Sequence, residues 1–453
     1  MTTTHLIRGG TLADGTRADV LLRAGRIAEV GPRVDAGSAQ VVDADGLLVL
    51  PGLVDLHTHL REPGFEESET VLTGSRAAAV GGFTAVNAMA NSSPVADTAG
   101  VVEQVQALGD AAGYVTVRPI GAVSQGLQGA QLSEIGAMAT SRARVRVFSD
   151  DGSCVSDPLL MRRALEYITG FGGVLAQHAQ EPRLTIGAQM NEGALSSELG
   201  LAGWPAVAEE AIIARDVLLA DHVGARLHVC HVSTAGSVEV IRWAKSRGIA
   251  VTAEVTPHHL LLTEDLIAGG PDGVDGYDAR YKVNPPLRRR EDVEALRSAL
   301  ADGTIDIVAT DHAPHTDEAK CCEWPAAANG MVGLESALSV VHESVVATGG
   351  LDWADVTRVL SSAPARIGQV AGQGQAITAG APAEVLLYDP AASRTFQRQD
   401  LAGQSTNSPY LGMRLPGRVV ATFHHGSATV LDGRAVDAER VAAAARAATA
   451  VSA

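Results

Sequence analysis

The sequence has few basic residues, few cysteines and no long hydrophobic run. Its 35 Lys and Arg residues are outnumbered by 52 Asp and Glu residues, which gives a formal net charge of −17. A surface this acidic repels phosphate backbones and anionic lipids, so the composition argues against a nucleic-acid-binding or membrane-surface protein. Lysine is especially scarce, because only Lys245, Lys282 and Lys320 occur in 453 residues.

Other shortages indicate the cellular compartment. The four cysteines show no CxxC spacing and are too few for a disulfide framework, which favours a reducing environment. The N-terminal segment MTTTHLIRGGTLADG lacks the apolar stretch of a signal peptide. No segment approaches the ~18 uninterrupted apolar residues that a membrane span requires. We therefore expect a cytoplasmic protein, and the 46% of hydrophobic residues predicts a large core.

The middle of the chain, residues 53–365, alternates short apolar segments with segments of helical period. The segments expected as strands are 53–60, 83–90, 114–123, 143–151, 172–180, 225–233, 250–259 and 306–314. Helical segments such as DPLLMRRALEYITG and REDVEALRSALADG separate them. Eight strands separated by helices predict an α/β fold, a (β/α)8 TIM barrel, with an open doubly wound sheet as the alternative.

The two ends of the chain have a different pattern. Residues 1–52 and 366–453 contain short runs of alternating apolar residues, separated by Gly and Asp, which are typical of antiparallel strands. Because both ends are rich in predicted strands, we expect them to pack together as one small discontinuous β-sandwich domain. In this domain His424 and His425 are expected on the surface.

Histidine and aspartate residues collect at the ends of the predicted strands. His57 and His59 end the first strand, and alternate residues of a strand point to the same side, so both imidazoles could face the barrel interior. Four other strands end in Asp151, His178, His231 and Asp311 with its neighbours. The carboxyl ends of barrel strands converge on one mouth, where barrel enzymes carry their active sites. His and Asp are ligands that Zn²⁺ prefers, so the pattern predicts a metal centre.

This ligand set also predicts a class of reaction. A divalent ion lowers the pKa of a bound water toward neutrality. An aspartate beside that water can take its proton and pass it to a leaving nitrogen. The sequence therefore predicts hydrolysis of an amide-like bond.

The motifs at these positions resemble those of the amidohydrolase superfamily and, more narrowly, of the bacterial class I dihydroorotases. The resemblance rests on HTHLREPG, NAMANSSP, SDDGS, CHVST, KVNPPLR and ATDHAPH, and it covers nearly the whole chain. It implies the reversible interconversion of dihydroorotate plus water with N-carbamoyl-L-aspartate, in the de novo biosynthesis of pyrimidines and UMP.

The resemblance also implies a role for each motif residue. His57, His59 and Asp311 would hold one zinc ion, His178 and His231 would hold a second, and Asp151 would bridge the two. Asp311 would also act as general base and then as general acid. The substrate would be bound by Arg61, Asn91 and His315 at its carboxylate, and by Asn284 and the backbone near Gly333 at its ring.

The scarcity of lysine bears on the bridging ligand. Many relatives, including hydantoinases and allantoinases, bridge their metals with a carboxylated lysine on the fourth strand. No lysine precedes Lys245 in this chain, so Asp151 is left for that role, as in the aspartate-bridged branch of dihydroorotases. One departure from the usual pattern is Ala90, where many relatives carry proline before the substrate-binding asparagine.

Two other functions remain open at this point. A catalytically inactive, dihydroorotase-like scaffold for aspartate transcarbamoylase should have lost metal ligands, whereas all six candidates are present. A hydantoinase- or allantoinase-type cyclic amidase is disfavoured by the missing lysine and by Arg61 with Asn91. The resemblance also suggests a homodimer and an association with aspartate transcarbamoylase.

Overall fold

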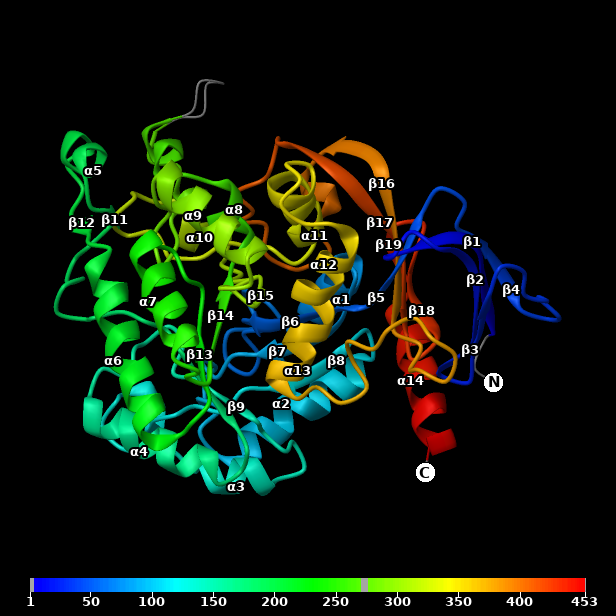
Figure 1. Ribbon diagram of the computed structural model, residues 1–453, viewed down its shortest axis with the longest axis horizontal. Helices are drawn as coiled ribbons and strands as arrows, with labels where there is room; N and C mark the ends of the chain where they lie inside the picture. The colour runs from blue at the N-terminus through cyan, green and yellow to red at the C-terminus, as the bar shows by residue number, and fades with distance from the viewer. Residues whose placement is uncertain (1–3, 270–275, 453) are drawn as a thin grey trace.

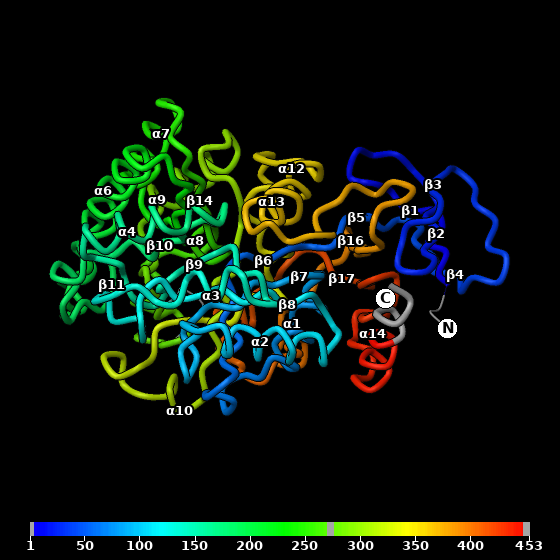
Figure 2. The backbone as a smooth tube through the Cα atoms, turned by 90° about the horizontal axis from the view of Figure 1, so that it is seen from below, coloured from blue at the N-terminus to red at the C-terminus, as the bar shows by residue number. Residues whose placement is uncertain are grey.

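The computed structural model describes residues 4–269 and 276–452. A larger α/β part contains the middle of the chain, and a β-rich part lies beside it with both ends of the described chain (Figure 1). The same division is visible from below, where the first strands and the last helix lie together (Figure 2). None of the helices in these two ranges is both long and apolar enough to cross a membrane.

Eight parallel strands form the barrel. They are β6 (Leu53–Thr58), β7 (Phe83–Ala88), β8 (Thr116–Pro119), β9 (Val147–Phe148), β10 (Val174–Gln177), β13 (Leu227–Val229), β14 (Val251–Val255) and β15 (Ile307–Val308). Hydrogen bonds join them into an arc of three strands and an arc of five. Parallel bridges from Gly121 to Phe148 and from Thr58 to His312 close the two gaps. The predicted barrel is confirmed, and each strand is shorter than the apolar segment that predicted it.

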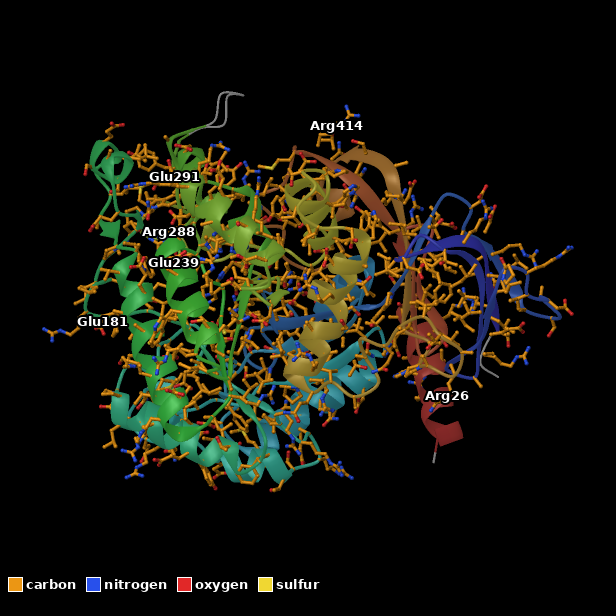
Figure 3. All side chains as sticks on the ribbon, viewed as in Figure 1. Arg26, Glu181, Glu239, Arg288, Glu291 and Arg414 are labelled. Atoms are coloured by element: carbon orange, nitrogen blue, oxygen red, sulfur yellow. The ribbon has the colours of Figure 1, made fainter. Side chains whose placement is uncertain are left out.

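Helices follow the barrel strands along the chain. The main ones are α1 (Val71–Val80), α2 (Ala99–Ala112), α3 (Ile135–Thr140), α4 (Pro158–Thr169), α6 (Val207–Val223), α7 (Ala235–Ser246) and α9 (Arg290–Ala301). Their starts are encoded locally, because Thr70, Asp157 and Thr234 each accept a hydrogen bond from a backbone N–H of the first turn. Arg414, at the start of β17 (Arg414–His424), projects from the surface in Figure 3, whereas Arg288, just before α9, is the largest fully buried side chain among the described residues and is 1% exposed.

Shorter elements occupy the connections. They are β11 (Met190–Asn191), α5 (Ala194–Leu199), β12 (Gly203–Trp204), α8 (Pro257–Leu261) and α10 (Asp317–Lys320). The chain after the loop that follows β15 forms α11 (Ala337–Val341), α12 (Trp353–Thr357) and α13 (Ala363–Gly368), with π-helical turns at His342–Val346 and Arg358–Ser362. His258 and His259 were expected in a strand but lie in α8, because Thr256 caps a helix that has Pro257 in its first turn.

The β-rich part is one sheet made from both ends of the chain. Its strands are β1 (His5–Leu12), β2 (Arg17–Arg23), β3 (Arg26–Gly31), β4 (Gln40–Asp43), β5 (Leu48–Pro51), β16 (Val385–Thr395), β17 (Arg414–His424), β18 (Ser427–Leu431) and β19 (Arg434–Ala435). β5 pairs with β16 and so joins the two ends. The sheet curls until Arg26 of β3 bridges to Pro382, and its two halves enclose a common core.

The sheet packs against the barrel helices. Leu386 and Val419 belong to the same core cluster as Ala77 of α1, and Thr422 donates a hydrogen bond to the Ala79 carbonyl. The last helix, α14 (Ala438–Ser452), contacts α2. The expected division at residues 52 and 366 stays a prediction, and residues 1–3 and 453 of the expected β domain lie outside the described residues.

One surface expectation in the β domain is wrong. His424 is 7% exposed, and its Nδ1 lies 2.8 Å from Oε2 of the buried Glu384. His425 is half-exposed, as expected, and its Nδ1 lies 2.9 Å from the other oxygen of Glu384. A long-range carboxylate partner therefore allows one imidazole to be buried, which the local sequence does not reveal.

Candidate metal centre

The predicted metal ligands meet at one mouth of the barrel. His57 lies in β6 and His59 just after it, while Asp151, His178, His231 and Asp311 follow β9, β10, β13 and β15. All six are buried. Residues up to 254 positions apart in the chain thus come together because parallel strands direct their carboxyl ends to the same side.

The backbone at this mouth is strained. Arg61, His231 and Asp311 have positive φ values of 61°, 30° and 47°. Residues with side chains rarely adopt this left-handed region. Such conformations cost about 1–3 kcal/mol each and concentrate at functional sites, where the surrounding structure holds them. The strain supports this mouth as the functional site.

Asp151 lies between two pairs of histidines. Its Oδ2 is 3.2 Å from Nε2 of His57 and 3.3 Å from Nε2 of His59. Its Oδ1 is 3.3 Å from Nδ1 of His178 and 3.2 Å from Nε2 of His231. Each carboxylate oxygen therefore faces one histidine pair, an arrangement suited to a carboxylate shared by two ions.

Asp311 completes the first of two ligand groups. Its Oδ1 lies 3.3 Å from Nε2 of His57 and 3.1 Å from Nε2 of His59. With Asp151 these residues place one potential ligand atom each within 4.8 Å of one another, and Asp151, His178 and His231 form a second such group. Asp151 is common to both groups, so the structure brings the six residues together in the pairing expected from the motifs.

The charge of the cluster fits a bound cation. Asp151 and Asp311 are only 3% and 5% exposed. Burial opposes a charge on His57, but the carboxylates of Asp151 and Glu254 outweigh it and raise the pKa of His57 well above its usual value. Nε2 of His57 has no hydrogen-bond partner among the described residues. Buried carboxylates around nitrogen donors are stabilised by a cation, and imidazole with carboxylate suits a borderline divalent ion such as Zn²⁺.

Glu254 is a functional candidate that the sequence reasoning missed. It lies in β14 and is 1% exposed. Its Oε1 is 2.6 Å from Nδ1 of His57, and its Oε2 is 3.0 Å from Nε2 of His228. Burial opposes ionisation of Glu254, but the two imidazoles outweigh it and lower its pKa to about 2. The signal that could have revealed Glu254 is its position as the single carboxylate in the apolar strand VTAEV. A carboxylate buried in a strand almost always has a partner, so it could have been expected to contact a functional group.

Two more polar side chains support the ligands. Oε1 of Gln180 accepts a hydrogen bond from Nε2 of His178 at 2.7 Å, which directs Nδ1 of that ring toward Asp151. Asp55, fully buried in β6, accepts the backbone N–H of Thr310 at 2.9 Å. Asp55 thereby ties the strand that carries His57 to the segment just before Asp311. Contacts of this kind orient metal-binding side chains.

The residues expected to bind the substrate carboxylate lie at the rim of this cluster. Arg61 and His315 are neighbours, with Nη2 of Arg61 3.5 Å from Nε2 of His315. Burial lowers the pKa of Arg61 to about 10, against the effect of Asp311 and Asp151, so the guanidinium stays charged near neutral pH. Oδ1 of Asn91 lies 2.9 Å from Nδ1 of His59. Arg61 is therefore a cation beside an acidic centre.

Asn284 and Gly333 differ in their surroundings. Nδ2 of Asn284 donates to Oε1 of Gln180 at 3.0 Å, while its buried Oδ1 has no partner among the described residues. That oxygen is available to a ligand N–H. The N–H of Gly333 instead donates to Nδ1 of His312 at 3.2 Å. The role expected for Gly333 stays a prediction, and its own N–H is already engaged by the protein.

Two of the three lysines hold the loop that follows β15. Nζ of Lys282 donates to the carbonyl oxygens of Trp324 and Ala327, at 2.6 and 2.8 Å. Nζ of Lys320 donates to those of Ala328 and Gly330, at 2.8 Å each. Both lysines are buried. The carbonyl of Asn329, between these two acceptors, lies 2.8 Å from Nε2 of His315.

Comparisons with known proteins identify the family of this chain. Residues 46–237 match the family described as Dihydro-orotase-like. The chain is 75% identical to the dihydroorotase of Leifsonia xyli subsp. xyli over 434 residues, which is 96% of this chain and 98% of that protein. It is 54% identical to the dihydroorotase of Mycobacterium tuberculosis over 431 residues, covering 95% of this chain and 99% of the relative.

Solved structures share the fold. An L-hydantoinase (dihydropyrimidinase) from Arthrobacter aurescens superposes with a TM-score of 0.83 at 25% identity, covering 96% of this chain and 98% of that one. A dihydropyrimidinase from Brevibacillus agri gives a TM-score of 0.82 at 23% identity, covering 96% of each chain. The family resemblance drawn from the motifs is confirmed. With 75% of its aligned residues identical to those of a dihydroorotase over almost its full length, this chain belongs to the dihydroorotase family of cyclic amidohydrolases.

Proposed function

We propose that this chain is a dihydroorotase with two zinc ions that interconverts dihydroorotate plus water with N-carbamoyl-L-aspartate in pyrimidine biosynthesis. The observation that carries the proposal is the position of Asp151, whose two oxygens face two different histidine pairs. His57, His59 and Asp311 would hold one ion, and His178 and His231 the other. Bound zinc would supply the Lewis acidity that activates water and polarises the ring carbonyl.

Asp311 is the residue proposed to move the proton. Burial opposes ionisation of its carboxyl, but His57 and His59 outweigh this and lower its pKa, so the group is ionised near neutral pH, the form that a general base requires. Its second oxygen is not among the atoms that face these histidines. Asp311 would take the proton of the attacking water and return it to the ring nitrogen as the ring opens.

The carboxylate of the substrate is proposed to bind between Arg61, Asn91 and His315. The planar guanidinium of Arg61 suits two parallel hydrogen bonds to a carboxylate. His315 is held neutral, because burial and the nearby Arg61 lower its pKa to about 3. The neutral imidazole of His315 can therefore contact the substrate carboxylate beside Arg61 without adding a second positive charge. Asn284 would use its unpartnered Oδ1 for an N–H of the pyrimidine ring.

The alternative function, a hydantoinase- or allantoinase-type cyclic amidase, acts on ring substrates that have no carboxylate substituent. Hydantoin and allantoin lack the carboxylate, so Arg61 would have no anionic partner from them. An assay of purified, zinc-loaded protein with dihydroorotate, hydantoin and allantoin side by side tests this distinction. We expect turnover of dihydroorotate far above that of the other two. Turnover of hydantoin without turnover of dihydroorotate would contradict the proposal.

Further features of the working enzyme follow from the family resemblance alone. A homodimer, an association with aspartate transcarbamoylase and a cytoplasmic location are proposed on this basis. Sedimentation of the purified protein, alone and mixed with the transcarbamoylase, tests the two associations.

A further inference from the structure

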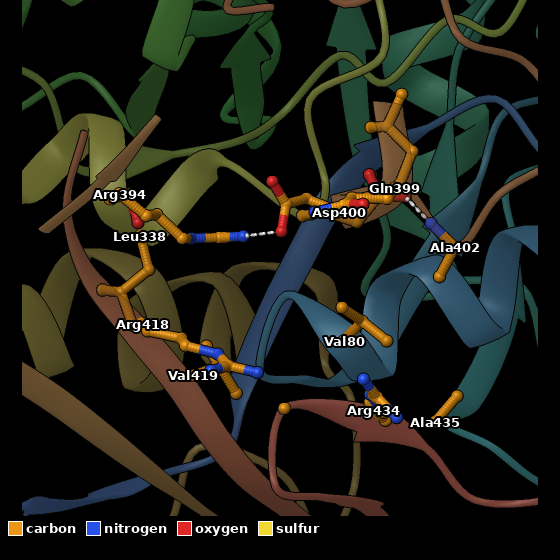
Figure 4. Close-up of a pocket in the computed structure, with 14 residues that line it drawn as sticks. Val80, Leu338, Arg394, Gln399, Asp400, Ala402, Arg418, Val419, Arg434 and Ala435 are labelled. Carbon is orange, nitrogen blue, oxygen red and sulfur yellow. Dashed lines mark hydrogen bonds and ion pairs between the residues drawn. The ribbon is translucent and has the colours of Figure 1, made fainter. Parts of the chain in front are cut away.

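A second cavity lies between the barrel helices and the curled sheet, and none of the proposed active-site residues lines it. Its volume is about 580 Å³, within the range of small-molecule sites. Its walls come from the end of α1, the start of α11, the strands β16, β17 and β19, and the 3-10 turn Arg398–Asp400 with the residues after it. Figure 4 shows these side chains around the open space.

Three arginines line this cavity although the whole chain is strongly acidic. They are Arg394, Arg418 and Arg434. Asp400 pairs with Arg394, as the dashed line in Figure 4 marks. The other acidic group in the wall, Glu335, accepts the backbone N–H groups of Ala402 and Gly403. Arg418 and Arg434 form no ion pair within residues 4–269 and 276–452, and the three arginines and two carboxylates of the wall leave a net charge of +1.

The Arg418 side chain is held in place by the backbone. Its Nη2 donates to the carbonyl oxygen of Asp432 at 2.9 Å. The guanidinium lies across Gly433, where a Cβ atom would come within 2.4 Å of Nη2. Gly433 also has a positive φ of 71°, a conformation that glycine adopts without strain. The turn between β18 and β19 therefore holds the Arg418 guanidinium in position.

The remaining wall determines what kind of anion fits. Arg418 and Arg434 are both exposed, so a ligand can reach their guanidinium donors, whereas Nε of Arg394 is buried. Val80, Leu338 and Val419 add an apolar surface. In Figure 4, Arg394 and Arg418 reach the space from one side, and Val80 and Arg434 lie opposite. A ligand that satisfies both parts of the wall carries an anionic group and an apolar or ring portion.

We propose that this cavity binds a small phosphorylated metabolite, with its phosphate between Arg418 and Arg434 and its organic portion against Val80, Leu338 and Val419. Arginine suits phosphate because its planar guanidinium can donate two parallel hydrogen bonds to one oxyanion. The volume accommodates a molecule of the size of a mononucleotide. The proposal is independent of the reaction at the metal centre.

Isothermal titration of the full-length, zinc-loaded protein tests this proposal. The probes are AMP, UMP and glucose 6-phosphate, each compared with adenosine, uridine or glucose. We expect at least one phosphorylated probe to bind and its dephosphorylated counterpart to fail. Arg418→Gln and Arg434→Gln should each weaken that binding at least about 10-fold, since a hydrogen bond to a charged group contributes about 1.5–3 kcal/mol.

The matched control is Arg414→Gln, which removes an exposed arginine from the same strand outside the cavity. It should leave the affinity unchanged. Arg434 is exposed and unpaired within the described chain, so Arg434→Gln remains informative if Arg418→Gln does not fold. No binding of any phosphorylated probe would overturn the proposal. Binding that persists undiminished in both cavity variants would also overturn it, because the phosphate would then lie elsewhere, for example at the metal centre.

Discussion

Oε1 of Glu254 lies 2.6 Å from Nδ1 of His57 and accepts the backbone N–H of His231 at 3.2 Å. A single buried carboxylate thus contacts one residue from each of the two proposed zinc sites. It fixes which nitrogen of His57 faces the metal cluster, and it holds the strained backbone of His231. Glu254 is therefore a positioning residue for both sites.

Replacing Glu254 by Gln should lower metal affinity about 10- to 100-fold, as is typical when a group behind a ligating histidine is lost. The amide cannot accept the His57 hydrogen bond with the same strength, and the imidazole loses its preferred orientation. Competition with a chromophoric zinc chelator measures the change. Asp19→Asn changes another buried carboxylate, which lies in the β domain and accepts the backbone N–H groups of Gly9 and Val34, and it should leave zinc affinity unchanged. Equal zinc affinity in Glu254→Gln and the wild type would remove this role.

The variant Asp311→Asn should reduce kcat by about 1,000-fold or more without unfolding the chain, because general acid–base catalysis contributes about 10²–10⁴. Circular dichroism and zinc analysis accompany the rate measurement. Asp306→Asn, just before β15, changes a carboxylate that pairs with Lys245 and should remain active. Rates close to wild type in Asp311→Asn would exclude Asp311 from proton transfer.

For Arg61→Met we expect KM for dihydroorotate to rise about 10- to 100-fold, since a charged hydrogen bond contributes about 1.5–3 kcal/mol. Zinc content should not change, because Arg61 offers no ligand atom to the cluster and its hydrogen-bond partners are the Pro314 carbonyl and His315. Arg61→Lys keeps the positive charge but loses the planar guanidinium. Its KM for dihydroorotate should therefore lie between those of the wild type and Arg61→Met. Loss of zinc from Arg61→Met would show that the residue supports the metal centre instead.

Lys320→Met should lower the melting temperature and make the loop over residues 316–331 more sensitive to protease. The change leaves buried carbonyl groups without their donor, which costs about 1–3 kcal/mol. Lys245→Met is the matched control, since Lys245 is more exposed and pairs with Asp306. A partly exposed pair of this kind contributes about 1 kcal/mol. Equal effects of the two substitutions would contradict a special role for Lys320.

His425→Gln should lower the melting temperature more at pH 5.5 than at pH 9. The hydrogen bond to Glu384 raises the pKa of His425 despite burial, and a raised pKa stabilises the fold below about pH 6.5 and loses this effect as the pH rises. Burial opposes ionisation of Glu384, but His424 and His425 lower its pKa to about 2, so it stays charged at both values. Melting curves at the two pH values provide the measurement.

The exposed His222 of α6 offers the control for this experiment. His222→Gln should show no difference between the two pH values. A loss of stability in His425→Gln that is independent of pH would indicate lost packing rather than a lost ionic contact.

Much of the barrel could be predicted from local patterns. Each barrel strand lies within a segment that was predicted from its run of apolar residues. A strand that is buried on both faces appears in the sequence as such a continuous apolar run. The error lay at the ends, where Pro257 and the cap at Thr256 start α8 inside a segment expected to be extended. A capping residue and a proline in the first helical turn were the available signals.

The barrel, the family and the His and Asp residues at the mouth could be predicted from the sequence, because strand periodicity and short motifs are local properties. The partners of Glu254, the burial of His424 and the grouping of Arg394 with Arg418 and Arg434 became visible in the folded chain alone. These depend on contacts between residues far apart in the chain. Lysine scarcity marked Asp151 as the bridging candidate, and the fold placed the two buried lysines, Lys282 and Lys320, against the loop beside His315.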